Sequence, residues 1–147
     1  MKQDTNLQIL QEAINGRDPA SITELDLGYK GLTSLPSEIG QLQNLTALYL
    51  WENNLTSLPP EIGQLQNLIS LWLSGNDLTS LPPEIGQLQN LKVLDLGDNN
   101  LTSLPPEIGQ LQNLTELDLY DDIPEAERQK IKSWLPNCEV IWENQYD

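Results

Sequence analysis

Carboxylates and aromatic rings are the most chemically capable side chains in this sequence. The 147 residues contain 22 acids against 7 bases, four tryptophans, four tyrosines and no histidine. Without histidine, the chain has no Ser-His or Cys-His nucleophile and no histidine metal site. Paired carboxylates can do acid and base work only where a pocket desolvates one of them and separates their pKa values. Catalysis therefore depends on whether the fold offers the acids such a pocket.

Other reactive motifs are sparse. Cys138 is the single cysteine, which excludes an internal disulfide and a CxxC metal or redox site, and we expect it to be a small buried hydrophobe. The glycines of "EIGQ" recur singly at fixed spacing, unlike those of a phosphate-binding loop. These residues imply no cofactor and no metal site.

The acidic balance restricts the partners. A formal net charge of −15 opposes contact with nucleic-acid phosphates and with anionic membranes, and favours a basic or neutral partner. The amino terminus, "MKQDTNLQILQEAINGRDP", has charges and amides where a signal peptide needs an apolar run, and no apolar stretch reaches membrane-spanning length. We expect a monomer in the cytoplasm, or a mature form whose signal has been removed.

A 23-residue repeat organises the chain. The motif "LTSLP" begins at Leu32, Leu55, Leu78 and Leu101 and opens four near-identical units, after a half unit "SITELDLGYKGL". A constant period of this length is typical of a solenoid, in which each unit is one coil. At 147 residues the chain is long enough for one such domain.

Each unit contains a short strand. In "NLTALYL", Leu48 and Leu50 are expected to point inward, while Ala47, Tyr49 and Trp51 point outward. Equivalent strands stack into a parallel sheet at about 4.8 Å per coil. The outward positions then form rows along the concave face.

The segment "LPPEIGQLQ" returns the chain to the next strand. Its prolines fix the backbone, Gly63 is expected to permit a tight bend, and Ile62, Leu65 and Leu68 point back into the core. Each coil is therefore predicted to be one strand plus one convex turn or short 3₁₀ segment.

The recurring pattern LxxLxLxxNxL resembles the leucine-rich repeat family in its 23-residue bacterial form, over roughly residues 22–122. The ending "IPEAERQKIKSWLPNCEVIWE" also looks like the caps of such proteins from spirochaetes and cyanobacteria. The resemblance implies an α/β solenoid: a right-handed horseshoe arc with parallel concave strands, a loop or 3₁₀ convex side and capped ends. It also implies a non-enzymatic protein-interaction module, because a shallow curved face offers no deep pocket to tune carboxylates.

One asparagine in each unit follows the strand, where backbone amides lack a partner in the sheet. A side-chain amide can satisfy them, and the family resemblance implies a structural ladder of Asn53, Asn76 and Asn99. We expect Asp122 to be its terminal variant, and Lys30 is a departure in the first half coil.

We predict one domain over residues 1–147, with capped ends. Residues 1–21 form an amino-terminal capping helix with Asp4 or Thr5 as N-cap, and residues 22–122 form the repeats. Residues 123–147 form a carboxyl-terminal cap, with a helix starting at Pro124 and then an edge strand. An open solenoid needs such caps because both of its ends expose leucines.

The concave rows hold most of the differences between coils, and we interpret them as a protein or peptide site. The central row is expected to read Asp26, Tyr49, Trp72, Asp95, Asp118. Tyr and Trp dominate interface hot spots, and charges orient a partner. The candidate partner-binding residues are an aromatic patch of Tyr29, Tyr49, Trp51 and Trp72 and an acidic rim of Asp95, Asp98, Glu116, Asp118 and Asp121.

Four alternatives remain open for this face. The aromatics can simply cover the sheet while the acids maintain solubility. The rings can stack on carbohydrate, and the acids can bind calcium, although no EF-hand-like loop organises them. Near-identity of the units also fits a scaffold engineered by consensus, without an evolved ligand.

Overall fold

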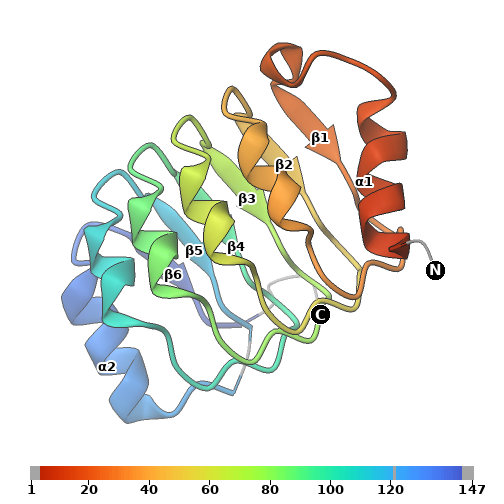
Figure 1. Ribbon diagram of the computed structural model, residues 1–147. Coiled ribbons are helices and arrows are strands. Elements are labelled where there is room, and N and C mark those ends of the chain that lie inside the picture. Colours follow the sequence, from red (N-terminus) through yellow and green to blue (C-terminus); the bar gives the residue numbers. More distant parts are fainter. Residues whose placement is uncertain (1–3, 121, 144–147) are drawn as a thin grey trace.

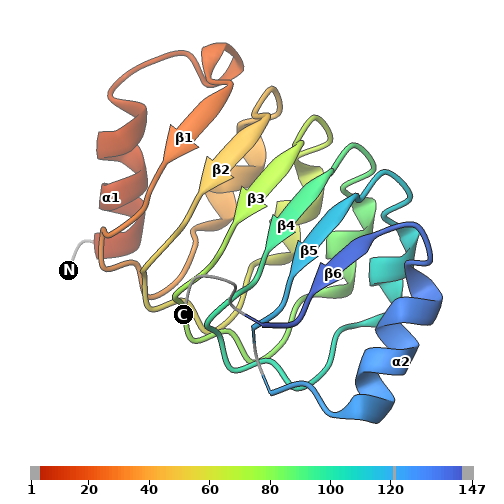
Figure 2. The same cartoon turned by 180° about the vertical axis from the view of Figure 1, so that it is seen from behind.

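Six short parallel strands form one open sheet on the concave side of the molecule. In the computed structural model, which describes residues 4–120 and 122–143, the strands lie side by side in sequence order (Figure 2). Each pairs with the next in the register of the repeat, so that Leu48 lies opposite Leu71. The strands are β1 (Glu24–Asp26), β2 (Ala47–Tyr49), β3 (Ser70–Trp72), β4 (Val93–Asp95), β5 (Glu116–Asp118) and β6 (Glu139–Ile141).

Short 3₁₀ turns form the opposite, convex layer (Figure 1). In the four repeats a proline with extended backbone precedes the turn, as Pro59 does with φ −71° and ψ 152°, so the fixed proline ring sets the entry to the turn. The predicted pairing of one strand with one 3₁₀ segment in each coil is confirmed. The turns span Ser37–Gln41, Pro60–Gln64, Pro83–Gln87 and Pro106–Gln110, with an additional short one at Pro19–Ser21.

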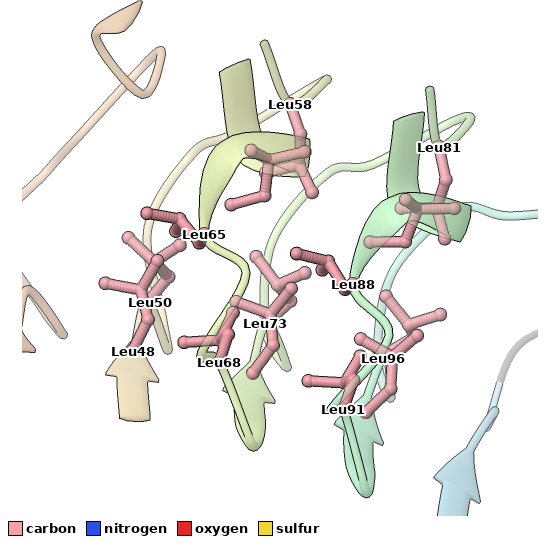
Figure 3. Packing of buried hydrophobic residues seen from close by; sticks show 14 of the residues in the cluster. Leu48, Leu50, Leu58, Leu65, Leu68, Leu73, Leu81, Leu88, Leu91 and Leu96 are labelled. Atoms are coloured by element: carbon pink, nitrogen blue, oxygen red, sulfur yellow. The ribbon is translucent and has the colours of Figure 1, made fainter. Parts of the chain in front are cut away.

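Leucines fill the space between the two layers (Figure 3). Leu48 of β2 and Leu50 just after it are fully buried, as the alternation predicts. Leu65 and Leu68 from the return path are also fully buried. Burying one such side chain contributes about 1.5–3 kcal/mol. Since a three-residue strand has little stability alone, each coil is stabilised mainly by the coils on either side.

The glycine of the convex turn is required by its contact with the next coil. Gly63 lies within the 3₁₀ turn Pro60–Gln64, and its backbone does not have a positive φ. A Cβ on Gly63 would collide with the backbone carbonyl of Glu84 and with the end of the Gln87 side chain, both from the following turn. The glycine therefore allows adjacent turns to approach closely.

Two asparagine ladders join the coils. Asn53, Asn76 and Asn99 form an inner one: Asn76, for example, accepts a hydrogen bond from the Leu55 N–H at 3.0 Å and donates to the carbonyls of Leu50 and Leu73. Asn53 and Asn76 are buried, whereas Asp122 is exposed at the corresponding position, so its role as terminal member stays a prediction.

The second ladder is exposed and lies at the start of the strands. Each of its asparagines donates from Nδ2 to a carbonyl of the preceding coil, at 2.7–2.9 Å. We did not predict this ladder, although its spacing of 23 residues is visible in the sequence. The members are Asn44, Asn67, Asn90 and Asn113.

A helix lies at each end of the row of coils (Figure 1). α1 (Thr5–Ile14) begins at Asp4, whose carboxylate accepts hydrogen bonds from two N–H groups of the first turn, and it buries Leu10. α2 (Glu125–Trp134) begins after Pro124, as predicted, and Trp134 packs against Gly109 of the last 3₁₀ turn. α2 therefore takes the convex place of a further coil, and β6 takes its concave place.

Candidate functional site on the concave face

The strand register places the predicted central row on the concave face. Each member lies directly opposite the next one along the sheet. The row also continues one strand farther than expected, because β6 keeps the 23-residue step. It reads Asp26, Tyr49, Trp72, Asp95, Asp118, Ile141.

Three of the four predicted aromatics meet. The ring centroids lie 4.9 Å apart for Tyr49 and Trp51, 6.3 Å for Tyr49 and Trp72, and 6.0 Å for Trp51 and Trp72. Tyr29 is 76% exposed in a left-handed turn position and makes no ring contact with described residues. The aromatic patch is thus smaller than expected, and we call Tyr49, Trp51 and Trp72 the ring platform.

The spacing of these rings determines how a ligand can use them. Centroid separations of 4.5–7 Å are those of rings in mutual contact, so they leave no gap for a ligand between the rings. The rings of Tyr49 and Trp72 are nearly parallel, at 12°, and both side chains are half-buried. The ring platform therefore offers an outer surface for stacking rather than an aromatic cage.

Large rings lie over two glycines in the row beside the strands. A Cβ on Gly97 would collide with the ring of Tyr120, whereas one on Gly28 would be in ordinary contact with Trp51, at 3.6 Å from its Cε3. In both cases the ring leans over the glycine 23 residues earlier. Gly97 therefore makes room for the Tyr120 ring of the next coil, while Gly28 is not required by Trp51.

The structure adds one residue to the acidic rim, and one predicted rim residue lies outside the described part of the chain. Glu116 lies opposite Glu139 of β6, which was not among the expected rim residues although it follows Glu116 by one repeat. Asp121 lies outside the described residues. No base neutralises the rim internally, because the one ion pair within residues 4–120 and 122–143 joins Lys130 to Glu127 on α2.

Two aspartates of the central row are bonded to their own turns. Oδ1 of Asp26 accepts a hydrogen bond from the Gly28 N–H at 2.9 Å, and Oδ1 of Asp95 accepts one from the Gly97 N–H at 3.0 Å. Burial raises the pKa of Asp95, and Asp98 raises it further, while the hydrogen bonds from Gly97 and Ser74 lower it. The net result is a pKa above the usual value.

Asp118, in the same row, has different surroundings. Its side chain is 7% exposed, and its Oδ1 is enclosed without a hydrogen-bond partner among the described residues. Burial, followed by repulsion from Asp95, Glu116 and Glu139, raises the pKa of Asp118 to about 7. This carboxyl was expected on an open rim, and the structure shows it nearly enclosed.

The described acids do not form a metal site. In the described ranges, no group of three or more acidic or cysteine side chains is placed to hold an ion. The described helices are also too short or too polar to cross a bilayer.

Comparison with known proteins identifies the repeats. A family model for leucine-rich repeats matches residues 66–122, and a model for two copies of the repeat matches residues 43–83. The chain belongs to the leucine-rich repeat family. Leucine-rich repeat domains are in general non-enzymatic scaffolds for protein interaction, which is the broad role expected here.

A solved leucine-rich repeat structure extends the comparison to the caps. A protein of this family from Leptospira interrogans is 34% identical, with a TM-score of 0.71. The match covers 97% of this chain and 47% of that protein, so the chain spans about half the length of this relative. No curated protein matches the chain. The bacterial type of the repeats, predicted from the sequence, is confirmed.

Proposed function

We propose that the concave face binds a protein or peptide, with the ring platform as its anchor and the acidic rim as its guide. The clustering of Tyr49, Trp51 and Trp72 carries the proposal, because three large rings in contact on a curved face are not needed to fold a coil. Other coils have Asp26, Asp95 and Asp118 at the position of Tyr49 and Trp72 and keep the same strand register. Aromatic anchors of this kind dominate the binding energy of protein interfaces.

Charge supports a partner with a basic portion. The chain has a formal net charge of −15, and Asp95, Asp98, Glu116 and Glu139 lie on one half of the concave face without a described ion-pair partner. Such a field attracts basic segments and repels nucleic acid and anionic lipid. We infer a monomeric binding role without catalysis, since no histidine is present and the rings and acids lie on a surface.

The ring platform can be tested by removing two of its rings. A Tyr49→Ala, Trp72→Ala double variant and a matched Ile69→Ala variant, which removes an exposed apolar side chain elsewhere, are used to capture partners from source cells. Proteins retained by wild type and lost by the double variant are purified, and their affinities are measured by surface plasmon resonance. We expect a loss of about 2 kcal/mol or more for the double variant, roughly 30-fold in affinity.

Two controls are needed to interpret this experiment. Ile69→Ala should bind as wild type does, and thermal unfolding should show the double variant folded. Wild-type affinity in the folded double variant would refute the ring platform as the site.

Carbohydrate is a second candidate ligand, favoured by the near-parallel rings of Tyr49 and Trp72 at 12°. Sugar rings stack on such surfaces without needing the acids. This candidate would be supported by a glycan that binds wild type and binds the Tyr49→Ala, Trp72→Ala variant more weakly. Its affinity should be unchanged by Asp95→Asn. A dependence on Asp95 would favour the basic protein partner instead.

A further inference from the structure

The sheet ends at β6, whose outer edge is open. β6 forms one edge of the sheet, and α1 lies beside β1 at the other edge (Figure 2). The Glu139 N–H donates to the Thr115 carbonyl at 2.9 Å. The Ile141 carbonyl accepts from the Leu119 N–H at 2.7 Å, so these two residues of β6 are bonded on the β5 side. Because successive residues of a strand direct their backbone groups to opposite sides, the N–H and C=O of Val140 point away from β5.

A groove along β6 gives access to this edge. It has a volume of about 370 Å³ and is lined by residues 139–143 and by Arg128. Val140 lies opposite the fully buried Leu117 of β5, but is itself only half-buried. In the described part of the chain, no strand lies beyond β6 to bond the outward N–H and C=O of Val140. These backbone groups are therefore within reach of a partner.

The occupant that fits such an edge is another extended backbone. An open strand edge presents donors and acceptors in a regular row, and the main chain of an extended segment supplies the complementary groups at the same spacing. Three half-buried hydrophobic residues, Val140, Ile141 and Trp142, follow one another along the groove. Apolar side chains of an added strand would cover their exposed parts.

The charge of the groove favours a basic segment. Glu139 and Glu143 are exposed, and neither has an ion-pair partner among the described residues. Glu139 also lies opposite Glu116, so β6 continues the acidic rim. Opposite charges on neighbouring strands stabilise their pairing, and like charges oppose it. Basic side chains therefore fit beside the two glutamates of the groove.

The base that lines the groove is engaged with other groups. Nε of Arg128 donates to the Ile123 carbonyl at 2.9 Å, and the guanidinium lies 5.0 Å from the Trp142 ring centroid. Arg128 therefore leaves the charges of Glu139 and Glu143 to be met by a partner.

We propose that the outer edge of β6 binds an extended segment of a protein partner as an additional strand. The segment has basic side chains beside Glu139 and Glu143, and apolar side chains beside the three residues between them. This contact goes beyond the proposed function, because it depends on main-chain hydrogen bonds at the end of the sheet and involves no ring of the ring platform.

The opposite edge of the sheet is less suited to such a segment. α1 lies beside β1, and the groove between them is lined by both bases and acids. The bases are Arg17 and Lys30, and the acids are Glu12, Glu24 and Asp26. A basic strand is therefore expected at β6 and not at β1.

The test uses the full chain and two short peptides. Amide NMR signals are followed during titration with the acetylated and amidated peptide TKVIVKT, which reads the same in both directions, so either strand orientation can form. TEVIVET is the peptide of reversed charge. Wild type is compared with Val140→Pro, which removes the outward N–H and is compatible with an edge strand.

A pair of charge variants accompanies the proline variant. Glu139→Lys reverses a charge in the groove, and Glu24→Lys makes the same change at the equivalent place in β1. Melting temperatures show which variants are folded, and the charge pair decides the question if Val140→Pro is not.

We expect TKVIVKT to shift the signals of residues 139–143 and of β5. Val140→Pro should weaken its binding by about tenfold or more, because main-chain hydrogen bonds are lost. Glu139→Lys should weaken it by about threefold or more, and Glu24→Lys by less than about twofold. TEVIVET should bind wild type more weakly than TKVIVKT does.

Several results would overturn the inference. They are absence of TKVIVKT binding, equal affinity for TEVIVET, shifts confined to β1, and wild-type affinity in folded Val140→Pro or in Glu139→Lys. Light scattering tests the other occupant of such an edge, a second copy of the chain. A dimer that Val140→Pro converts to a monomer would assign the edge to self-association and refute the proposed partner strand.

Discussion

Replacing Asp118 by Asn changes the pH dependence of stability through a single residue. The pKa of Asp118 is about 7 in the folded chain against an ordinary value of 3.8, so the folded state holds this proton more tightly than the unfolded state does. Its contribution to stability is therefore greatest below pH 4, falls as pH rises to about 7, and stays low above that. We expect Asp118→Asn to melt at a higher temperature than wild type at pH 8, and the difference to vanish near pH 4.

Melting temperatures at pH 4, 6 and 8 check this expectation. Asp26→Asn is the matched control, because its exposed carboxyl has the same place in the row. The difference between each variant and wild type cancels the titration of the other acids. A constant difference across the three pH values for Asp118→Asn would contradict the enclosed, proton-holding carboxyl.

Residue positions could be predicted from the sequence better than residue environments. The 23-residue step correctly placed Tyr49, Trp72 and Asp95 in one row. It could not show that Asp118 is enclosed while Asp26 is exposed, because the repeat assigns both to the same place. Burial depends on the neighbouring strand, and Asp118 lies beside the non-repetitive β6.

The two asparagine ladders differ in how much they contribute to the coil. Asn76→Ala would leave the buried Leu55 N–H without its partner. The carbonyls of Leu50 and Leu73 would each lose one of two donors and keep the hydrogen bonds from Asn53 and Asn99. We expect a loss of about 1–3 kcal/mol in unfolding free energy, since the buried N–H loses its solvation as well as its bond. Urea unfolding measures this loss.

The outer ladder supplies the matched variant. Asn67→Ala removes one exposed hydrogen bond to the Gln43 carbonyl, and water can replace it. Its cost should stay below about 1 kcal/mol. Equal losses for the two variants would show that burial does not distinguish the ladders.

At the level of elements, the sequence predicted the strands, the convex turns and both cap helices. Alternating leucines and proline-bounded turns are local signals, and they repeat often enough to exclude coincidence. The close packing at Gly63 was missed because it arises from Glu84 and Gln87 in the next coil, a contact that no local pattern contains. The pairing of Glu116 with Glu139 was missed although its 23-residue spacing was readable.

At the scale of the whole molecule, we expect residues 123–147 to close the carboxyl-terminal end of the solenoid, and deleting them tests this role. Ile131 and Leu135 are buried, and Trp134 covers Gly109 of the last 3₁₀ turn. Their loss should uncover the leucine-lined end of the last coil and the edge of β5, so the truncated chain should associate or unfold. Light scattering after size exclusion, together with thermal unfolding, measures both.

A point variant tests whether the surface charges of the cap, rather than its packing, stabilise the chain. Lys130→Ala removes an exposed ion pair with Glu127 and should leave association and melting nearly unchanged. A truncated chain that stayed monomeric with the melting temperature of the full chain would show that the cap is dispensable.

Because all six strands share one register, two positions in the same row of the concave face are separated by a whole number of strand spacings. Recombination between near-identical units can add or remove 23 residues in frame, and the new coil would pair as its neighbours do. An extra unit between Trp72 and Asp95 would place Asp95 and Asp118 about 4.8 Å farther from the ring platform without altering any of these side chains. Gene duplication would therefore tune the length of the peptide that fits, in steps of one coil, and leave the chemistry of both contact points unchanged.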